Sequence, residues 1–230
     1  DSPTFGSSNG GNFASWNILS RTNPALQYGT SLYSEGATRF AGGTDGSVST
    51  ATTLQMQSGK WYVELCPIGA PTSGWPCAGL VYTDQLGVAQ STSNLQPTNA
   101  FTSWVDLSAG TIYDFAGNGS AAYGASLGDG DILNIAVDVD AGKVWWGKNG
   151  TYFDSGNPAG GSGEGDTFTA GRDVSFHAGI YDGAGKIAIN AGQDGSFAGA
   201  KTAQGNADGN GYGNFFYAPP SGFLALCTAN

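Results

Sequence analysis

Apolar residues in this chain come in short runs, and turn-favouring residues interrupt them about every ten positions. No run keeps the apolar period of about 3.6 residues that marks an amphipathic helix. Helix is therefore expected for a turn or two at most, near residues 23–27, where Pro24 suits a first helical turn. The pattern predicts strands over residues 38–40, 48–55, 60–66, 78–82, 103–107, 111–114, 132–139, 143–146, 174–181, 186–190 and 222–228. Many short strands with little helix predict an all-β fold, a two-layer antiparallel β-sandwich.

Residues 128–150, GDGDILNIAVDVDAGKVWWGKNG, carry the clearest local prediction. A strand over 132–139 reverses at 140–142 into a second strand over 143–147. Asn149 and Gly150 then close a tight type I′ turn, because both of its central positions need positive φ. The strand over 132–139 is apolar on both faces near its middle, which is typical of a central strand.

Composition supports one domain over residues 1–230, because β-sandwiches commonly exceed the average domain length. Charged residues make up 11% of the chain and hydrophobic residues 40%, so the sequence is too apolar for disorder and can bury a core. Two irregular stretches, 155–172 and 193–218, are rich in Gly, Ser and Asp. Loops of this length in a compact domain are usually functional or flexible.

The formal net charge of −10 makes a nucleic-acid partner improbable and argues against attraction to anionic membranes. No apolar run approaches the length of about 18 residues needed for membrane insertion. A polar surface that is poor in Lys fits a secreted or particle-surface protein, although host-cytosol residence stays open. With no initiator Met or signal peptide, we expect a fragment or processed product of a longer polypeptide.

Two cysteines flank a Pro/Gly-rich connection: Cys66 ends one predicted strand and Cys77 starts the next. If these strands pair as a hairpin, the two thiols lie close enough for a cross-strand disulfide. The alternative is two buried free thiols, and the unknown redox compartment leaves both open. Cys227 has no obvious partner and is expected to be a small core residue.

Catalytic chemistry finds little support. Glycoside hydrolysis needs two carboxyls across a cleft, and the three glutamates, Glu35, Glu64 and Glu164, show no such arrangement. Several aspartates lie at the ends of predicted hairpins, where an Asp side chain commonly hydrogen-bonds to the backbone of the turn. The single histidine, His177, lies in an apolar strand without a nucleophile elbow and is expected to be structural. We expect no catalytic residue, no cofactor and no zinc site.

A weak calcium motif occurs in the segment NADGNG. Asn206, Asp208 and Asn210 place oxygen ligands at alternate positions, as the start of a calcium loop does. No acidic ligand follows at the twelfth position, so a polar turn is the favoured interpretation.

Several ordered blocks of the sequence resemble the signature of SPRY domains. They are SGKWYVEL (58–65), AGLVY (78–82), AYG (122–124), residues 128–150, VSFHAGI (174–180) and KIAINAG (186–192). The flanks DSPT (1–4), NFASWNIL (12–19), GKNGTYFDSGNP (147–158) and APPSGFLALCTAN (218–230) are similar to SPRY modules of bacteriophages and other environmental viruses. The resemblance implies a concanavalin-like sandwich with a non-enzymatic recognition or scaffolding role on a virion or its tail. The loops depart from the better-known members, so no ligand-contacting residue is transferred.

Aromatic residues give the candidate ligand contacts, because sugar rings stack on Trp and Tyr. Trp75 lies in the connection between two strands, and Trp145 and Trp146 point to opposite faces of one strand. Trp146 matches a position that the family keeps aromatic, which leaves Trp145 as the more exposed candidate. Further candidates are Tyr212, Trp104 and Tyr113. For each, burial in the core or a subunit contact is the favoured alternative.

The sequence therefore predicts a recognition module whose loops at the sandwich rim bind a glycan or protein of a host surface. The alternative is a purely structural role in capsid decoration or tail assembly, and a glycoside hydrolase is less favoured. Expected partners are other virion subunits and a host-surface glycan or protein, and the expected location is the virion surface or the extracellular space.

Overall fold

The computed structural model describes residues 11–20, 33–42, 47–69, 76–86, 102–113, 120–181 and 185–230. Its strands are β1 (Tyr33–Ser34), β2 (Arg39–Ala41), β3 (Ser47–Ala51), β4 (Lys60–Ile68), β5 (Cys77–Tyr82), β6 (Thr102–Asp106), β7 (Thr111–Tyr113), β8 (Ser120–Ala122), β9 (Leu133–Asp138), β10 (Lys143–Lys148), β11 (Thr151–Tyr152), β12 (Asp166–Thr167), β13 (Val174–Tyr181), β14 (Lys186–Asn190) and β15 (Leu224–Ala225). Two short 3₁₀ turns, η1 (Thr83–Gln85) and η2 (Phe153–Ser155), are the helical elements of the described residues. None of the helical turns in these ranges is long and apolar enough to cross a bilayer.

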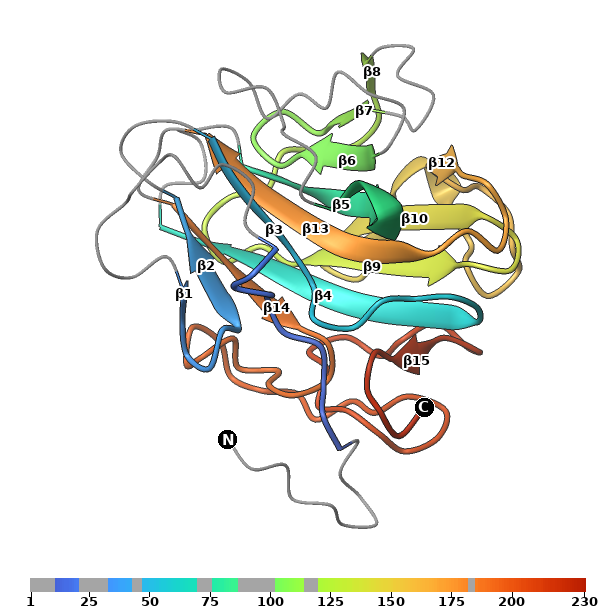
Figure 1. Cartoon of the computed structure of the whole chain (residues 1–230). Coiled ribbons are helices and arrows are strands. Elements are labelled where there is room, and N and C mark those ends of the chain that lie inside the picture. The colour runs from blue at the N-terminus through green and yellow to red at the C-terminus, as the bar shows by residue number, and fades with distance from the viewer. Residues whose placement is uncertain are drawn as a thin grey trace.

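The strands form two sheets. The large sheet has nine strands in the order β1-β2-β14-β4-β9-β10-β11, with β12 beside β10 and β15 beside β4. The small sheet has six strands in the order β3-β13-β5-β6-β7-β8. Neighbouring strands are antiparallel, except that β15 runs parallel to β4. Figure 1 shows β13 and β3 lying over β4 and β9, so the predicted antiparallel sandwich is confirmed.

The main core lies between the two sheets. Alternate residues of the central strands point into it, as the period of two along a strand requires. From the large sheet these are Val63, Leu65, Ile135, Val137, Val144 and Trp146, and from the small sheet Leu80, Val105, Phe176, Ala178 and Ile180. The facing side chains make one contiguous cluster, which holds the two sheets together by burial of apolar area.

The predicted hairpins at residues 128–150 are confirmed. Strand β9 pairs with β10 along its length and lies between β10 and β4, so it is a central strand. Asn149 and Gly150 have φ of 51° and 82°, and Lys148 pairs with Thr151 across them. These positive values are those a type I′ turn needs, which explains why this dipeptide joins β10 to β11.

All eleven predicted strands occur. The bounds of β13 and β14 match the prediction, most other ends differ by one or two residues, and β3 and β15 are shorter than predicted. Those that the pattern missed, β1, β8, β11 and β12, are only two or three residues long, too short to show alternation. The predicted turn of helix at 23–27 lies outside the described residues.

Strands β4 and β5 do not pair as a hairpin, so the condition for a Cys66–Cys77 disulfide is not met. Strand β4 pairs with β14, β9 and β15 in the large sheet, whereas β5 pairs with β13 and β6 in the small sheet. Cys66 and Cys77 therefore lie in different sheets, and both are buried free thiols. Burial raises the pKa of the Cys66 thiol to about 11, which keeps it protonated. Cys227 is also free and buried, as expected for a small core residue.

Residues 192–230 form a layer on the outer face of the large sheet, here called the C-terminal layer. Figure 1 shows this segment, orange to red, on the side of β4 and β14 away from β13. Its apolar side chains pack on those of the sheet that point out of the sandwich, and together they make two clusters. The first contains Tyr62, Ala136, Trp145, Phe215, Phe223, Ala225 and Cys227, and the second Cys66, Ile132, Ala188 and Phe197. The outer face of this sheet is therefore a second core.

Candidate functional site

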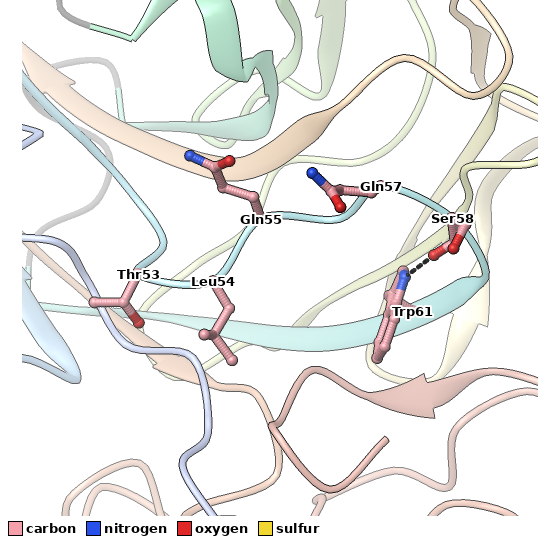
Figure 2. A pocket seen from close by; sticks show the side chains of 6 residues that line it. All are labelled: Thr53, Leu54, Gln55, Gln57, Ser58 and Trp61. Carbon is pink, nitrogen blue, oxygen red and sulfur yellow. Dashed lines mark hydrogen bonds between the residues drawn. The ribbon is translucent and has the colours of Figure 1, made fainter.

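An open groove of about 490 Å³ lies between the end of β3 and the start of β4. We call it the Trp61 groove. Its lining is Thr53, Leu54, Gln55, Gln57, Ser58 and Trp61. Figure 2 shows Gln55 and Gln57 on the connecting loop above the groove and Trp61 at its far end. Every lining side chain is uncharged, and one is a large aromatic ring.

The loop that carries the amides is held by β13. The backbone of Met56 exchanges two hydrogen bonds with Val174, at 2.8 and 3.0 Å, and its side chain is buried in the main core. Gln55 and Gln57, the residues on either side, are exposed. Because successive side chains of an extended segment point to opposite sides, burying Met56 turns both amides outward.

Trp61 is fixed in orientation although it is only half-buried. Its Nε1 donates a hydrogen bond of 2.6 Å to the carbonyl oxygen of Ser58, and its ring packs against the edge of the main core. Gly59, at φ of 84°, adds no side chain beside the ring; a Cβ there would lie 3.6 to 3.7 Å from three indole atoms. The indole therefore keeps a fixed position with part of its surface accessible.

Two further contacts fix the rim of the groove. The side chain of Gln57 donates from Nε2 to Asp173 Oδ2 at 3.1 Å. Thr53 Oγ1 accepts a hydrogen bond of 3.1 Å from the backbone N–H of Ser15. The Thr53 hydroxyl keeps its own proton to donate, and the Gln57 amide keeps its oxygen to accept.

Trp145 is not the exposed aromatic that the sequence predicts; its exposure is 0%. It points to the opposite face from Trp146, as expected, but the C-terminal layer covers that face. Its ring meets Phe223 edge-on at 6.0 Å, and Nε1 donates to the carbonyl oxygen of Ser162 at 2.9 Å. Trp145 is therefore no more exposed than Trp146, and burial, the favoured alternative, is confirmed; residues far away in sequence supply the cover.

The other aromatic candidates do not gather at the groove. Trp104 is 4% exposed and stacks on Tyr113 with ring centroids 4.0 Å apart, on the outer face of the small sheet. Tyr113 is half-buried in this pair, and Tyr212 is half-buried against the cluster beneath the C-terminal layer. Trp75 lies outside the described residues. Of these four candidates, those that the structure describes pack chiefly against other parts of this chain.

Glu64 is a buried carboxylate that anchors the C-terminal layer. It accepts hydrogen bonds from the Tyr62 hydroxyl, the Asn190 amide and the backbone N–H groups of Phe216 and Tyr217, at 2.7 to 3.0 Å. Burial raises the pKa of Glu64 above its ordinary value, and these hydrogen bonds lower it in part. With its oxygens engaged by donors of its own chain, Glu64 is organised to hold structure together.

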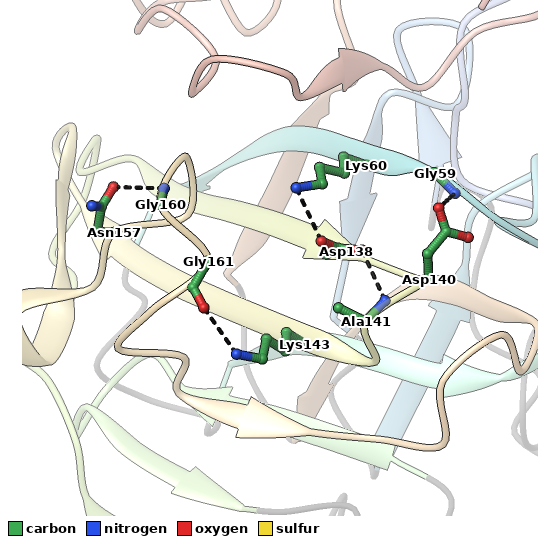
Figure 3. A network of polar contacts seen from close by, with 9 residues as sticks. All are labelled: Gly59, Lys60, Asp138, Asp140, Ala141, Lys143, Asn157, Gly160 and Gly161. Carbon is green, nitrogen blue, oxygen red and sulfur yellow. Dashed lines mark hydrogen bonds and ion pairs between the residues drawn. The ribbon is translucent and has the colours of Figure 1, made fainter.

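Aspartates at the hairpin ends of residues 128–150 accept backbone hydrogen bonds, but only Asp131 and Asp138 accept them within their own turn, as the sequence predicts. Asp140 accepts from the backbone N–H of Gly59 at 3.1 Å, and Asp138 accepts from that of Ala141 at 2.9 Å (Figure 3). Asp138 also pairs with Lys60 at 3.1 Å. Asp131 accepts from the N–H of Gly128 within its own turn, and Asp129 accepts from the N–H of Gly69, which follows β4. Asp131 and Asp138 thus stabilise their own turns, whereas Asp129 and Asp140 tie a hairpin end to a distant segment.

The weak calcium candidate is organised around hydrogen-bond donors. Asp208 is buried and accepts from the backbone N–H groups of Asn210, Tyr212 and Ala225 and from the Asn230 amide. Asn206 turns its Nδ2 toward the carbonyl oxygens of Phe215 and Phe216. A calcium site presents oxygen lone pairs to the ion, whereas here N–H groups occupy those of Asp208. The favoured interpretation, a polar turn, fits this geometry.

His177 lies on the outer face of the small sheet, on β13. Both ring nitrogens are buried without a hydrogen-bond partner, although part of the residue stays exposed. Loss of solvation lowers the pKa of His177 to about 4, so the ring is neutral near pH 7. None of the described residues around it is hydrogen-bonded to the ring, and the structural role expected for this histidine stays a prediction.

Sequence reasoning missed the Trp61 groove. Trp61 lies on the inward face of β4 with Val63 and Leu65, but it is not among the candidates that the sequence predicted. A usable signal was present: two glutamines flank the buried Met56, and the Ser-Gly turn at 58–59 brings them back toward the first residues of β4.

Comparison with known proteins shows likeness in fold. No protein-family model and no curated protein matches this chain. Among solved structures, the SPRY domain of human HERC1 superposes with a TM-score of 0.54 at 14% sequence identity, covering 76% of this chain and 96% of that one. The likeness supports the SPRY-type β-sandwich expected from the sequence.

Proposed function

Starting from a SPRY-like β-sandwich, we propose that this chain is a non-enzymatic recognition module that binds a component of a cell surface at the Trp61 groove. The observation that carries the proposal is a fixed, partly accessible indole beside uncharged side chains, most of them polar. Binding sites commonly combine apolar or aromatic surface with a few oriented polar groups. The groove supplies both on strands and loops pinned to the core.

The chemistry of the carboxylates also supports binding over hydrolysis. A hydrolase of glycosides needs one carboxyl free to give a proton and a second across a cleft. Glu64 is buried and engaged by its own chain, and Glu164 pairs with Lys143 at 3.2 Å. The lining of the Trp61 groove includes no acid or base.

We propose further that the module belongs to a virus particle, where it faces the extracellular space and contacts other virion subunits. Support comes from the flanking sequences, which resemble SPRY modules of bacteriophages. The acidic, Lys-poor composition fits a particle surface as well. In this setting the cell-surface component would belong to the host.

Binding to cells tests the proposal. A fluorescently labelled chain is incubated with a panel of bacterial strains that differ in their envelopes, beside the variants Trp61→Ala and Gln55→Ala. We expect the wild type to bind at least one strain and both variants to bind it less. Gln204→Ala, an exposed glutamine on the C-terminal layer, serves as the matched control and should bind as the wild type does. Absence of binding to every strain, or equal binding by all variants, would contradict the proposal.

A second candidate, a structural role in a particle lattice, rests on an exposed apolar pair. Ile18 and Leu19 are 58% and 89% exposed. The turn that presents them is tied to β3, since Asn17 donates to the carbonyl oxygen of Ala51 and Ser20 Oγ accepts from the N–H of that residue. Imaging the intact particle distinguishes the two roles. A regular lattice of copies touching through Ile18 and Leu19 would favour assembly, and isolated copies would favour recognition.

A further inference from the structure

We infer that the Trp61 groove binds an uncharged saccharide, with a face of one sugar ring stacked on the Trp61 indole. This inference rests on the proposed function and names the class of ligand for the same site. Four features support this inference: the Trp61 indole, the polar groups around that ring, the strand edge beside the groove and the charge of its surroundings.

The platform is suited to a flat, weakly apolar ligand face. Trp61 cannot rotate freely, because Nε1 is bonded to the Ser58 carbonyl oxygen at 2.6 Å and the ring packs on the core. No side chain at residue 59 covers the indole. The C–H face of a sugar ring can pack on such a surface without losing hydroxyl hydration.

The polar groups match hydroxyls. Gln55 carries an exposed amide that can both donate and accept. Gln57 is oriented by its bond to Asp173, which leaves its oxygen as an acceptor, and Thr53 can donate its hydroxyl proton. A sugar hydroxyl donates one hydrogen bond and accepts others, so it can use either kind of group.

A polypeptide fits the groove less well. Extended peptides often bind by adding a strand to an open sheet edge, but β3 is bonded here to the N-terminal segment. The N–H of Asn17 donates to Ala51 and that of Thr53 to Ser15, each at 2.8 Å. Proline-rich peptides use grooves lined by several aromatic rings, whereas this groove has one.

Charge selects against acidic ligands. No charged side chain lines the groove, and the charged group bonded to the lining residue Gln57 is the carboxylate of Asp173. The whole chain carries a formal net charge of −10. Sialylated or sulfated sugars would therefore meet repulsion without a cation to compensate, which leaves neutral saccharides.

A glycan array gives the first test. The purified chain is applied to immobilised neutral oligosaccharides built from glucose, galactose, mannose and N-acetylglucosamine, and to sialylated and sulfated ones. We expect binding to one or more neutral sugars and none to acidic ones, with at least about tenfold weaker binding by Trp61→Ala. Gln55→Ala, which removes an exposed side chain, should weaken binding as well, while Gln204→Ala should not. If Trp61→Ala fails to fold, the binding of Gln55→Ala to the same sugars still tests the inference. Binding unchanged in Gln55→Ala, or restricted to acidic sugars, would overturn the inference.

Treated cells separate this inference from the proposed function. Strains bound by the chain are treated with periodate, which cleaves vicinal diols of sugars, or with protease. Loss of binding after periodate, with retention after protease, supports a saccharide ligand. Loss after protease alone overturns the inference and leaves the recognition function standing. If no strain is bound before treatment and no array sugar is bound, both fail.

Discussion

Trp61 and Trp145 lie two strands apart in the large sheet and have opposite environments. Trp145 on β10 is fully buried beneath the C-terminal layer, with its indole N–H bonded to Ser162. Trp61 on β4 also satisfies its N–H within the chain, yet it stays half-exposed beside uncharged side chains. In both places a hydrogen bond from the indole N–H to a backbone carbonyl oxygen fixes the orientation of the ring. What differs is whether the chain covers the ring.

The solvent exposure of a tryptophan ring therefore depends on distant segments of the chain as much as on the strand that carries it. Residues 192–230 contribute Phe215, Phe223 and Ala225 to the cluster around Trp145 and add two backbone donors to Glu64. At the Trp61 groove the neighbouring loop instead turns Gln55 and Gln57 outward. The covered face is expected to govern stability, and the open groove to govern binding.

The largest expected effect is that of Trp145→Ala. Emptying the space of a fully buried indole should lower the free energy of unfolding by about 3–5 kcal/mol. Trp61→Ala, at a half-buried position, should lower it by only about 1–2 kcal/mol. Urea unfolding followed by circular dichroism measures both values. Equal losses at the two positions would remove the distinction between the covered face and the groove.

Glu64→Gln should have the next largest effect. The amide replaces one acceptor oxygen by a donor that faces N–H groups of its own chain, so we expect a loss of about 2–4 kcal/mol. Glu164→Gln is the matched control, because Glu164 forms a partly exposed ion pair with Lys143 and should change stability by less than about 1 kcal/mol. The comparison is made by chemical denaturation at pH 7. A Glu64 variant as stable as the control would show that the carboxylate does not anchor the C-terminal layer.

His177 gives a smaller, pH-dependent effect on the outer face of the small sheet. Its folded-state pKa of about 4 lies below the ordinary value of 6.5, so the unfolded chain binds a proton more readily. Stability should therefore fall as the pH drops from about 6.5 to about 4, by on the order of 2 kcal/mol. His177→Leu should flatten this part of the profile and leave stability at pH 7 nearly unchanged, because the imidazole nitrogens lack partners. Thermal unfolding of both proteins at several pH values provides the measurement, and parallel profiles would contradict the account.

Local patterns predicted most of the strands, because a few adjacent residues are enough to indicate a strand or a turn. The turn at Asn149-Gly150 and the central strand over 132–139 are examples, and both are confirmed. Pairings between distant segments were harder to predict. The link after β4 crosses to the other sheet, which no feature of its Pro/Gly-rich sequence specifies.

The candidate site was harder to predict for the same reason. The apolar residues of 193–218 show no regular spacing. The sequence of this segment therefore did not predict that it would cover Trp145 and leave Tyr212 half-buried. The importance of Trp61 depends on where Met56 meets Val174, a contact between residues more than a hundred positions apart. Such contacts decide exposure, and a strand pattern does not contain them.

The central claim is that the Trp61 groove is where this module meets its partner, and binding by groove variants tests it most directly. The measurement is the affinity of wild type, Gln55→Ala, Trp61→Ala and Gln204→Ala for the same bound cells or array sugar, after equal folding is verified by circular dichroism. We predict weaker binding for the two groove variants and an unchanged value for Gln204→Ala. Equal affinity of all four proteins would contradict the claim.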